Sequence, residues 1–288
     1  VQKRIKLNHV GLFSDGTAVK QVGEKTFKLS QIVIDEMILV NTDEVCAAIK
    51  DIFEDTRCIQ EPAGALALAG LKKWTSQKKN IPKNLIAITC GANLNFDRLR
   101  FISERSELGE EKETLLSVTL PEARGSFLKF CGLIKNKNLT EFNYRISNES
   151  SANVFVGVQV KNKVEGKAVM GTLRKEGFLV TDLTHDEVSK LHIRHMVGGR
   201  SSLAVNERLY RFEFPERPGA LIKFLSSMNN SWNISLFHYR NHGSDTGRIL
   251  VGLQVPPGEI KSLNLFLKSL GYNYTNETTN TAYNLFLK

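Results

Sequence analysis

The chain has 288 residues, of which 41% are hydrophobic and 24% charged; this describes a folded globular protein with room for two or three domains. The net charge is +9, but the basic residues are scattered. Their densest group, within residues 72–83, ends a helix-like stretch where positive charge complements the helix dipole. We therefore expect no nucleic-acid partner. No apolar run is long enough to cross a bilayer, so we expect no membrane partner either.

The cysteines indicate a reducing compartment. Cys46, Cys58, Cys90 and Cys131 form no CxxC pair, and they read as reduced thiols of an intracellular protein. The chain shows no signal peptide and opens at Val1 in mid-pattern, without an initiator methionine. The expected location is the cytoplasm, with an organellar stroma or matrix as the alternative.

The first part of the chain alternates between strand and helix patterns. Residues 1–36 form a loop-rich lead-in, and the compact apolar runs 37–40 and 85–89 predict strands. Alternation of this kind is typical of an α/β layer, but two strands cannot close a doubly wound domain. We expect this region to be the tail of such a domain.

Helix starts are marked in the same region. Asn41 and Glu44 have the spacing of a capping box, and Pro62, directly after Glu61, suits the first helical position. Residues 90–93 predict a turn before a further helix. The charged residues 108–113 then predict a connector.

The rest of the chain is a duplication. Its segments recur at an almost constant offset of 94 (215 − 121) or 95 (237 − 142) residues. An offset this long indicates two tandem domains rather than a solenoid. The matching pairs are 121–130 with 215–224, 142–145 with 237–240, and 154–160 with 249–255.

Each copy predicts the order strand, helix, strand, strand, helix, strand, which is the ferredoxin-like βαββαβ order. The second copy extends from Arg208 to about Thr275. Between the copies, Thr184 and Glu187 predict a capping box for a linker helix that ends near Val197. Residues 280–288 alternate weakly and predict an edge strand. In the first copy we expect strands at 115–120, 139–146, 152–160 and 178–182, and helices at 125–135 and 164–175.

Three histidines have a spacing that must be considered for a metal site. His185, His192 and His195 fall at helical offsets of 7 (192 − 185) and 3 (195 − 192), a spacing that resembles metal ligands. No carboxylate or cysteine is fixed near them by the pattern, and solvent-facing histidines on a polar linker are commoner. We expect no metal site.

Two tyrosines occupy the same place in the two copies. Tyr144 and Tyr239 are each followed by an arginine, Arg145 and Arg240. A buried tyrosine hydroxyl needs a polar partner, and arginine can bind a carboxylate with two hydrogen bonds. The pair suits recognition of a zwitterionic small molecule, while core packing for the tyrosines and solvated positions for the arginines stay open.

An RNA-recognition module shares the βαββαβ order, so a binding role for RNA must be weighed. Such modules place aromatic and basic residues on the third strand to stack bases. Here residues 154–160 contain one aromatic residue and no charge, and the matching residues 249–255 contain no aromatic residue. We reject the RNA interpretation.

Several motifs together resemble biosynthetic threonine dehydratase (threonine ammonia-lyase), and the resemblance covers essentially the whole chain. In the first part they are Gly11–Val19, Ile52–Asp55, Glu61–Gly70 and Gly91–Phe96. In the duplicated part they are Gly125–Phe127, Glu141–Arg145, Val197–Arg200 and Trp232–Arg240.

The resemblance implies a fold-type-II pyridoxal-phosphate lyase that deaminates L-threonine to 2-oxobutanoate and ammonia in isoleucine biosynthesis. It further implies two ACT-like regulatory domains, isoleucine as inhibitor, valine as antagonist, and a homotetramer. By motif, Cys90 takes the place of a residue that hydrogen-bonds the cofactor's pyridine nitrogen, and Glu61 lies near the same ring. Tyr144 and Tyr239 match effector-contacting positions, with Arg240 beside the latter.

The implied fold is an α/β remnant of a fold-type-II catalytic domain followed by two α+β ferredoxin-like domains. The family's Schiff-base lysine and glycine-rich phosphate loop do not occur in this sequence, so we expect the regulatory part of the enzyme, inactive by itself. The alternative is a stand-alone amino-acid-sensing protein without catalysis. The expected boundaries are 1–107 for the catalytic portion, 108–183 and 208–288 for the ACT-like domains, and 184–207 for the linker.

Overall fold

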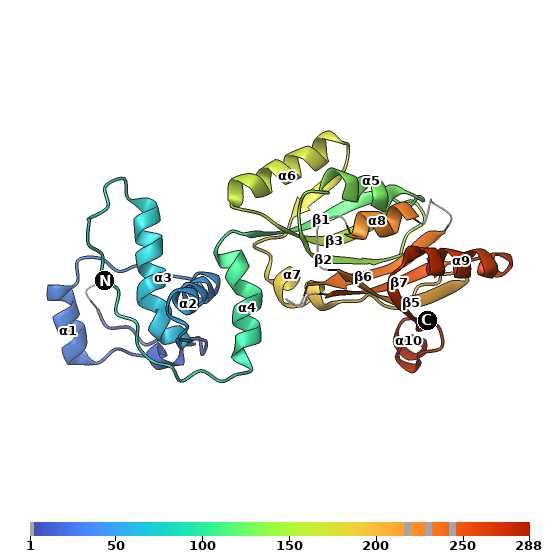
Figure 1. Ribbon diagram of the computed structural model, residues 1–288. Coiled ribbons are helices and arrows are strands. Elements are labelled where there is room, and N and C mark those ends of the chain that lie inside the picture. Colours follow the sequence, from blue (N-terminus) through green and yellow to red (C-terminus); the bar gives the residue numbers. More distant parts are fainter. Residues whose placement is uncertain (1–2, 216–219, 228–231, 242–245) are drawn as a thin grey trace. The chain divides into compact units, whose positions relative to one another are not determined.

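The structure is a computed structural model that describes residues 3–215, 220–227, 232–241 and 246–288 (Figure 1). The predicted repeat segment 215–224 therefore lies partly outside the described residues. The chain divides into two compact units, residues 1–110 and 111–288. In the described part of the chain, no helix is both long and apolar enough to span a membrane.

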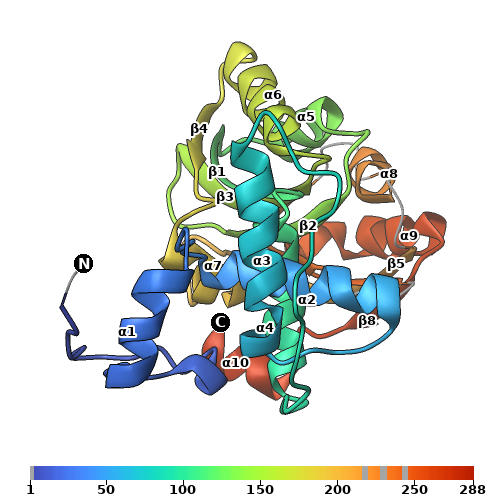
Figure 2. The ribbon, with the colours of Figure 1, turned by 90° about the vertical axis from the view of Figure 1, so that its left-hand side faces the viewer.

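The first unit is helical. Its elements are η1 (Asp15–Thr17), α1 (Glu24–Val33), α2 (Thr42–Thr56), α3 (Pro62–Gln77) and α4 (Arg98–Gly109). The predicted capping box forms at the start of α2: Glu44 N donates to Asn41 Oδ1 at 2.9 Å, and Asn41 N donates to Glu44 Oε2 at 2.7 Å. Pro62 is the first residue of α3, as predicted. Helix α2 lies across α3 (Figure 2), and side chains of both helices, among them Val45, Ile49 and Ala65, share one apolar cluster.

The two strands expected in this unit are not formed. Residues 37–40 and 85–89 are extended, but no strand pairs with them among the described residues. Several of their large apolar side chains are exposed, with Leu39 at 83% and Ile86 at 89%. The lead-in also differs from the expectation, because residues 24–33 form helix α1.

Residues 111–288 fold around a sheet of eight strands, counted over the described residues, in the order β4-β1-β3-β2-β6-β7-β5-β8. Each repeat contributes a ferredoxin-like half, as predicted, and the halves join where β2 pairs with β6. The strands are β1 (Glu113–Pro121), β2 (Leu139–Arg145), β3 (Ser151–Gln159), β4 (Leu179–Asp182), β5 (Glu207–Pro215), β6 (Asn233–Arg240), β7 (Thr246–Gln254) and β8 (Asn273–Asn276).

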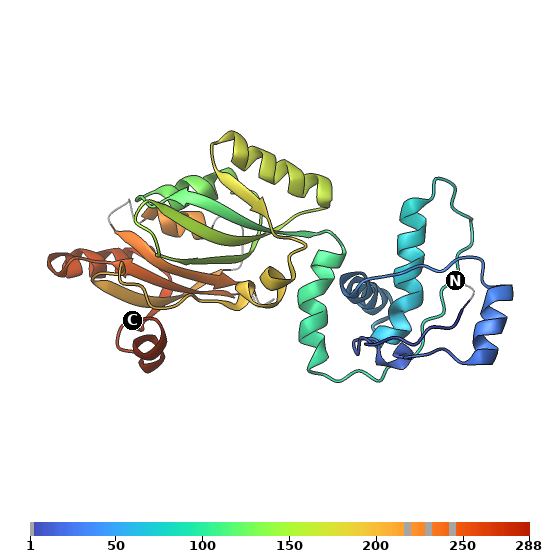
Figure 3. The same cartoon turned by 180° about the vertical axis from the view of Figure 1, so that it is seen from behind.

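The two faces of the sheet are covered differently. Helices α5 (Ser126–Leu133), α6 (Lys163–Lys175), α8 (Ala220–Ser227) and α9 (Ile260–Leu270) cover one face, where aromatic and aliphatic side chains form a continuous core (Figures 1 and 3). We call this the helix face. Leu209, Leu236 and Tyr283 form a smaller apolar cluster with α10 (Thr281–Phe286) on the opposite face, here called the back face.

The structure of the segments that follow each repeat differs in two places from the prediction. Helix α7 (Glu187–Leu191) starts two residues later than predicted, because Asp186 Oδ1, not Thr184, accepts the capping hydrogen bond from Ser189 N at 2.7 Å. It gives way to η2 (Ile193–His195) before reaching Val197. Residues 281–286 form α10 rather than an edge strand, because the Asn280 side chain caps Ala282 N and Tyr283 N. The two caps lie 94 residues apart (280 − 186), so α7 and α10 are repeat equivalents. The short η3 (Pro257–Glu259) precedes α9.

Candidate functional site

Tyr144 and Tyr239 lie on β2 and β6, the two paired strands at which the repeats join. In the antiparallel register Tyr144 faces Phe237, and Phe142 faces Tyr239. Both tyrosine side chains point into the core of the helix face, with exposed fractions of 3% and 7%. The Tyr144 ring also meets Phe127 edge-on, with 4.9 Å between ring centroids. The structure thus places both tyrosines within packed apolar surroundings.

A half-buried carboxylate connects Tyr144 to the other repeat. The Tyr144 hydroxyl donates to Glu122 Oε2, and Asn233 Nδ2 donates to Glu122 Oε1 at 3.1 Å. Burial and the hydrogen bond to Glu122 raise the pKa of Tyr144 well above its usual range, so the hydroxyl stays protonated and acts as a donor. The Glu122 side chain is therefore held at the seam by one donor from each repeat.

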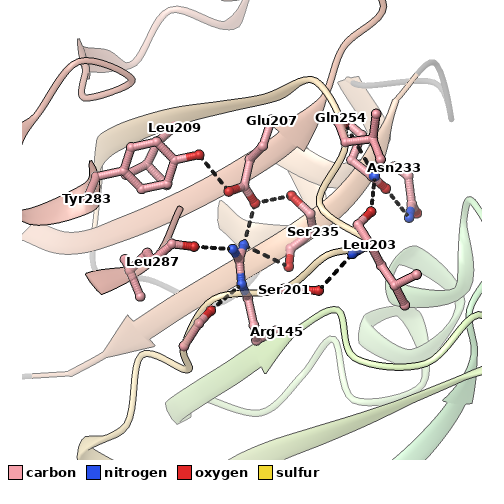
Figure 4. A network of polar contacts seen from close by, with 12 residues as sticks. Arg145, Ser201, Leu203, Glu207, Leu209, Asn233, Ser235, Gln254, Tyr283 and Leu287 are labelled. Atoms are coloured by element: carbon pink, nitrogen blue, oxygen red, sulfur yellow. Dashed lines mark hydrogen bonds and ion pairs between the residues drawn. The ribbon is translucent and has the colours of Figure 1, made fainter. Parts of the chain in front are cut away.

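The same pair of amide side chains forms a hydrogen bond within each repeat. Asn233 Nδ2 also donates to Gln254 Oε1 at 3.1 Å, and the equivalent Asn138 Nδ2 donates to Gln159 Oε1 at 3.0 Å. Figure 4 shows Asn233 and Gln254 side by side, with Gln254 Nε2 donating to Leu203 O at 2.7 Å. The duplication has therefore retained an asparagine at the start of β2 and β6 and a glutamine at the end of β3 and β7.

A small, mostly apolar pocket opens beside Glu122. It lies where the loop and first turn of α5 in one repeat approach α8 and the start of β6 in the other. The cavity volume is only about 20 Å³, so an amino acid would bind at the mouth of the pocket, with its ammonium group near Glu122 and its carboxylate near Arg124. The lining residues are Ala123, Arg124, Gly125, Phe127, Leu128, Leu225, Trp232, Asn233 and Ile234.

Arg240 lies on the opposite side of the sheet from Tyr239. Neighbouring residues of a strand point to opposite faces, and Arg240 is buried on the back face with its Nη1 against His195 Nδ1. Its Nε lies 3.7 Å from Glu141 Oε1. The structure therefore does not bring Arg240 together with the two tyrosines.

Arg240 of the second repeat thus contacts the first repeat, and Arg145 of the first repeat contacts the second in the same way. Its Nη1 pairs with Glu207, its Nη2 donates to Leu287 O at 2.6 Å, and its Nε donates to Gly199 O at 2.9 Å (Figure 4). Tyr283 of α10 donates its hydroxyl to Glu207 Oε2 at 2.7 Å. Arg145 thus fastens β2 of one repeat to β5 and the C-terminal helix of the other.

The equivalent back-face cluster of the first repeat contains two carboxylates. Arg194 donates from Nε to Glu141 Oε1 at 2.6 Å and from Nη2 to Glu113 at 3.4 Å. Glu141 is 1% exposed, and its Oε2 has no hydrogen-bond partner among the described residues. Burial foremost, with a contribution from Glu113 and against the influence of Arg194, raises the pKa of Glu141 to about 7.

The sequence analysis did not predict these buried back-face charges, although the duplicated segments contain one signal for them. The segments 154–160 and 249–255 share a glycine, Gly157 in β3 and Gly252 in β7. A Cβ added to Gly252 would lie 2.5 Å from Glu207 Oε1, and one added to Gly157 would overlap Thr140 Oγ1, which donates to Glu113. Both glycines therefore leave room for a buried carboxylate and its hydroxyl partner.

In the first unit, Glu61 lies against the residues that directly follow Cys90. Glu61 N donates to Gly91 O at 3.0 Å, and Asn93 N donates to Glu61 Oε2 at 3.1 Å. Gly91 has a φ of +89°, and a Cβ there would overlap the Glu61 carboxylate. The turn 90–93 is thus held against the first turn of α3, with the Cys90 thiol exposed.

The arrangement of Glu61 with residues 90–93 suits only the ring end of pyridoxal phosphate, the cofactor that the family resemblance implies. A thiol and a carboxylate suit the ring end of pyridoxal phosphate, since both can hydrogen-bond a pyridine nitrogen or ring substituent. The segments that form the corner, residues 60–64 and 90–93, contain no cation and no glycine-rich loop for a phosphate group. The two residues therefore do not make a cofactor site by themselves.

Comparison with known proteins identifies similar regulatory domains and similar enzymes. Residues 104–193 and 198–287 each match the family described as the C-terminal regulatory domain of threonine dehydratase. The chain is 56% identical over 285 residues to the biosynthetic L-threonine dehydratase IlvA of Burkholderia multivorans, which covers 99% of this chain and 56% of that protein. The first family match ends at the start of η2 and the second just after α10, so the matched copies include α7 and α10 respectively.

Other relatives give the same picture. The biosynthetic enzyme of Escherichia coli is 49% identical, over 98% of this chain and 55% of its own length. The mitochondrial threonine dehydratase of Saccharomyces cerevisiae is 49% identical, over 99% and 52%. Among solved structures, the processed form of threonine deaminase isoform 2 from Solanum lycopersicum is 42% identical, covers 35% of this chain and 30% of that one, and has a TM-score of 0.35. The chain spans about half the length of the curated relatives it matches.

Proposed function

Because the chain belongs to the threonine dehydratase family, whose C-terminal regulatory domain it contains in two copies, we propose that it is the feedback-regulated part of such an enzyme. The parent enzyme would convert L-threonine to 2-oxobutanoate and ammonia in isoleucine biosynthesis. The observation that carries the regulatory role is the apolar pocket beside Glu122, at the seam where the two repeats meet. A ligand bound there would contact both repeats at once and so bias their relative packing.

The effectors in this proposal are isoleucine as inhibitor and valine as antagonist. Glu122 receives the ammonium group, Arg124 receives the carboxylate, and Phe127 and Leu225 contact the aliphatic side chain. Tyr144 contributes through Glu122, because its hydroxyl holds that carboxylate in place. Tyr239 and Arg240 remain proposed effector residues by family resemblance, although they lie on opposite faces of β6.

Isoleucine should bind the full chain, and Glu122→Gln should weaken that binding about tenfold or more, because the amide loses the charge that attracts the ammonium group. Tyr144→Leu should have a similar effect with some loss of stability. Titration calorimetry gives the affinities, and thermal melts report folding. Glu176→Gln, at an exposed position, is the matched control and should leave the affinity unchanged. Unaltered affinity in folded Glu122→Gln and Tyr144→Leu proteins would remove the pocket from the proposal.

For the remainder of the chain we propose that residues 1–107 are the C-terminal portion of the catalytic domain, followed by ACT-like domains at 108–183 and 208–288 with the linker 184–207 between them. Pyridoxal phosphate would serve the parent enzyme, with Cys90 and Glu61 at the ring end of its site. We also propose a homotetrameric parent enzyme in the cytoplasm or an organelle; one relative is named as a mitochondrial enzyme.

The chain alone should form no stable Schiff base with pyridoxal phosphate, since Cys90 and Glu61 supply neither the amine nor a phosphate-binding loop. Incubation with the cofactor, borohydride reduction and mass spectrometry should find no lysine labelled stoichiometrically, and threonine should yield no oxoacid. Full labelling of one lysine together with oxoacid production would contradict this and assign catalysis to the chain itself. Isoleucine binding without either activity would also fit the alternative of a stand-alone amino-acid sensor.

A further inference from the structure

A cavity of about 520 Å³ lies on the back face of the second repeat, between strands β5 and β7 and helix α10. Small-molecule sites in proteins have volumes of roughly 300–1,000 Å³, so this cavity is large enough for a whole ligand. Its wall is mainly apolar and includes Val197, Leu209, Leu250, Phe286 and Leu287. The cavity is on the opposite face of the sheet from the pocket beside Glu122, so it is not part of that candidate site.

The inner wall of the cavity is buried and held in place. Leu209 and Tyr283 belong to one apolar cluster and are each 2% exposed. The Tyr283 hydroxyl donates to Glu207 Oε2 at 2.7 Å (Figure 4). At the rim, by contrast, the ring of Phe286 is 71% exposed. A ligand that covers this ring gains free energy, because apolar area leaves water.

A guanidinium group borders the cavity. Arg211 faces Leu250 across the pairing of β5 with β7. Its Nε donates to Glu277 Oε1 at 3.1 Å, and Asn280 Nδ2 donates to Glu277 Oε2 at 2.9 Å, so both oxygens of this carboxylate are engaged. Arg211 Nη2 donates to Thr275 Oγ1 at 3.3 Å, whereas Nη1 has no hydrogen-bond partner among the residues that the structure describes. Because a guanidinium has five N–H donors, Arg211 can still bind the carboxylate of a ligand.

The first repeat has a different pair of residues at the equivalent place. Ser117 faces Phe155 across β1 and β3, as Arg211 faces Leu250 across β5 and β7. The offsets are 94 (211 − 117) and 95 (250 − 155) residues. Phe155 is 6% exposed, and Leu250 is only partly buried. The second repeat therefore combines a smaller apolar side chain with a cation where the first repeat has a buried ring and a hydroxyl group.

We propose that the back-face cavity is a binding site for a small monocarboxylate with an aliphatic body. The carboxylate of the ligand pairs with Arg211, and its aliphatic part packs against Leu250, Phe286 and Leu287. The carbonyl of Leu287 also accepts a hydrogen bond from Arg145 Nη2 at 2.6 Å. A ligand in the cavity thus stabilises the segment through which Arg145 fastens the first repeat to α10.

The first test uses sodium octanoate as the probe, titrated into the full chain by calorimetry. Leu250→Phe should raise the Kd for octanoate about tenfold or more, because the larger ring fills the cavity. The fold accepts a phenylalanine at the equivalent Phe155. Arg211→Met should also raise this Kd about tenfold, because a charge-assisted hydrogen bond is lost. Leu285→Ala, on α10 but outside the cavity wall, is the matched control and should leave the Kd unchanged. An unchanged Kd in folded Leu250→Phe and Arg211→Met proteins would overturn the proposal.

The second test separates the carboxylate from the aliphatic body. Octanol should bind the parent chain more weakly than octanoate, and Arg211→Met should not change its Kd. Octanol that binds as tightly as octanoate would refute the assignment of a carboxylate ligand. Glu122→Gln should leave the octanoate Kd unchanged, since Glu122 lies at the other pocket. A parent chain that does not bind octanoate, but dimerises in sedimentation experiments unless it carries Phe286→Ser, would overturn the proposal and assign the cavity to a contact between two copies of the chain.

Discussion

Replacement of Arg145 by methionine is expected to lower the free energy of unfolding of residues 111–288 by about 3–5 kcal/mol. The side chains of Arg145 and Glu207 are only 8% and 3% exposed, so the substitution leaves a carboxylate buried without its counter-charge. Ser235 and Tyr283 still donate hydroxyl hydrogen bonds to Glu207, but neither supplies a positive charge. The carbonyls of Leu287 and Gly199 lose their donor at the same time.

Urea unfolding followed by Trp232 fluorescence, in the Trp74→Phe background, measures this loss in the second unit. Arg211→Met is the matched control, because Arg211 pairs with Glu277 at 3.1 Å on the same sheet but is 42% exposed. That exposed pair should contribute less than about 1 kcal/mol. The double variant Arg145→Met/Glu207→Gln should recover part of the loss. If Arg145→Met costs no more than Arg211→Met, the buried pair does not stabilise the seam.

The duplicated part of the fold could be predicted from sequence because the same pattern occurs twice. Alternating apolar residues and turn residues gave the βαββαβ order in both repeats, and the structure confirms that order. The join between the halves could not be predicted in this way. Pairing of β2 with β6 depends on which strand edges meet in space, and no local pattern encodes that.

The strands expected in the first unit show the limit of local patterns. Residues 37–40 and 85–89 have strand composition, but a strand forms only when a neighbour accepts and donates its backbone hydrogen bonds. Alternate side chains there, such as Met37 and Leu39 or Ile86 and Ile88, are exposed by 76–89%. The reverse error occurred at 280–288, where a single asparagine cap at Asn280 outweighed a weak alternation.

The effector-binding role of the two tyrosines stays a prediction, but their position in the fold is known. The repeat-equivalent tyrosines drew attention to the seam, and the structure places both of them there. The alternation of side chains along a strand already predicts that Tyr239 and Arg240 cannot line the same pocket, since adjacent residues point to opposite faces. The burial of the back-face charges was not predicted, because charged residues at alternate positions normally indicate solvent and the glycines at 157 and 252 are the one signal against it. These charged residues are buried instead, because α7, η2 and α10 cover the back face of the sheet.

Glu141 should make the stability of the second unit fall as the pH rises. Its pKa is about 7 in the folded protein against 4.5 for an ordinary glutamate. The folded state therefore retains a proton that the unfolded state has released, and stability is lost as the pH rises through about 7. Glu113, Arg194 and Arg240 face this carboxyl group, with His195 behind Arg240.

Glu141→Gln removes this titration and keeps the shape of the side chain. Relative to the parent chain, the variant should gain about 2.5 kcal/mol between about pH 5 and about pH 8, because only the parent must ionise a buried carboxyl group. Urea unfolding at both pH values measures the difference. Any loss of stability that the substitution causes at Arg194 independently of pH cancels in this comparison. Glu176→Gln, at an exposed position, should show a far smaller change. A difference between Glu141→Gln and the parent that is independent of pH would mean that Arg194 holds Glu141 ionised throughout, and that its unpaired oxygen binds no proton.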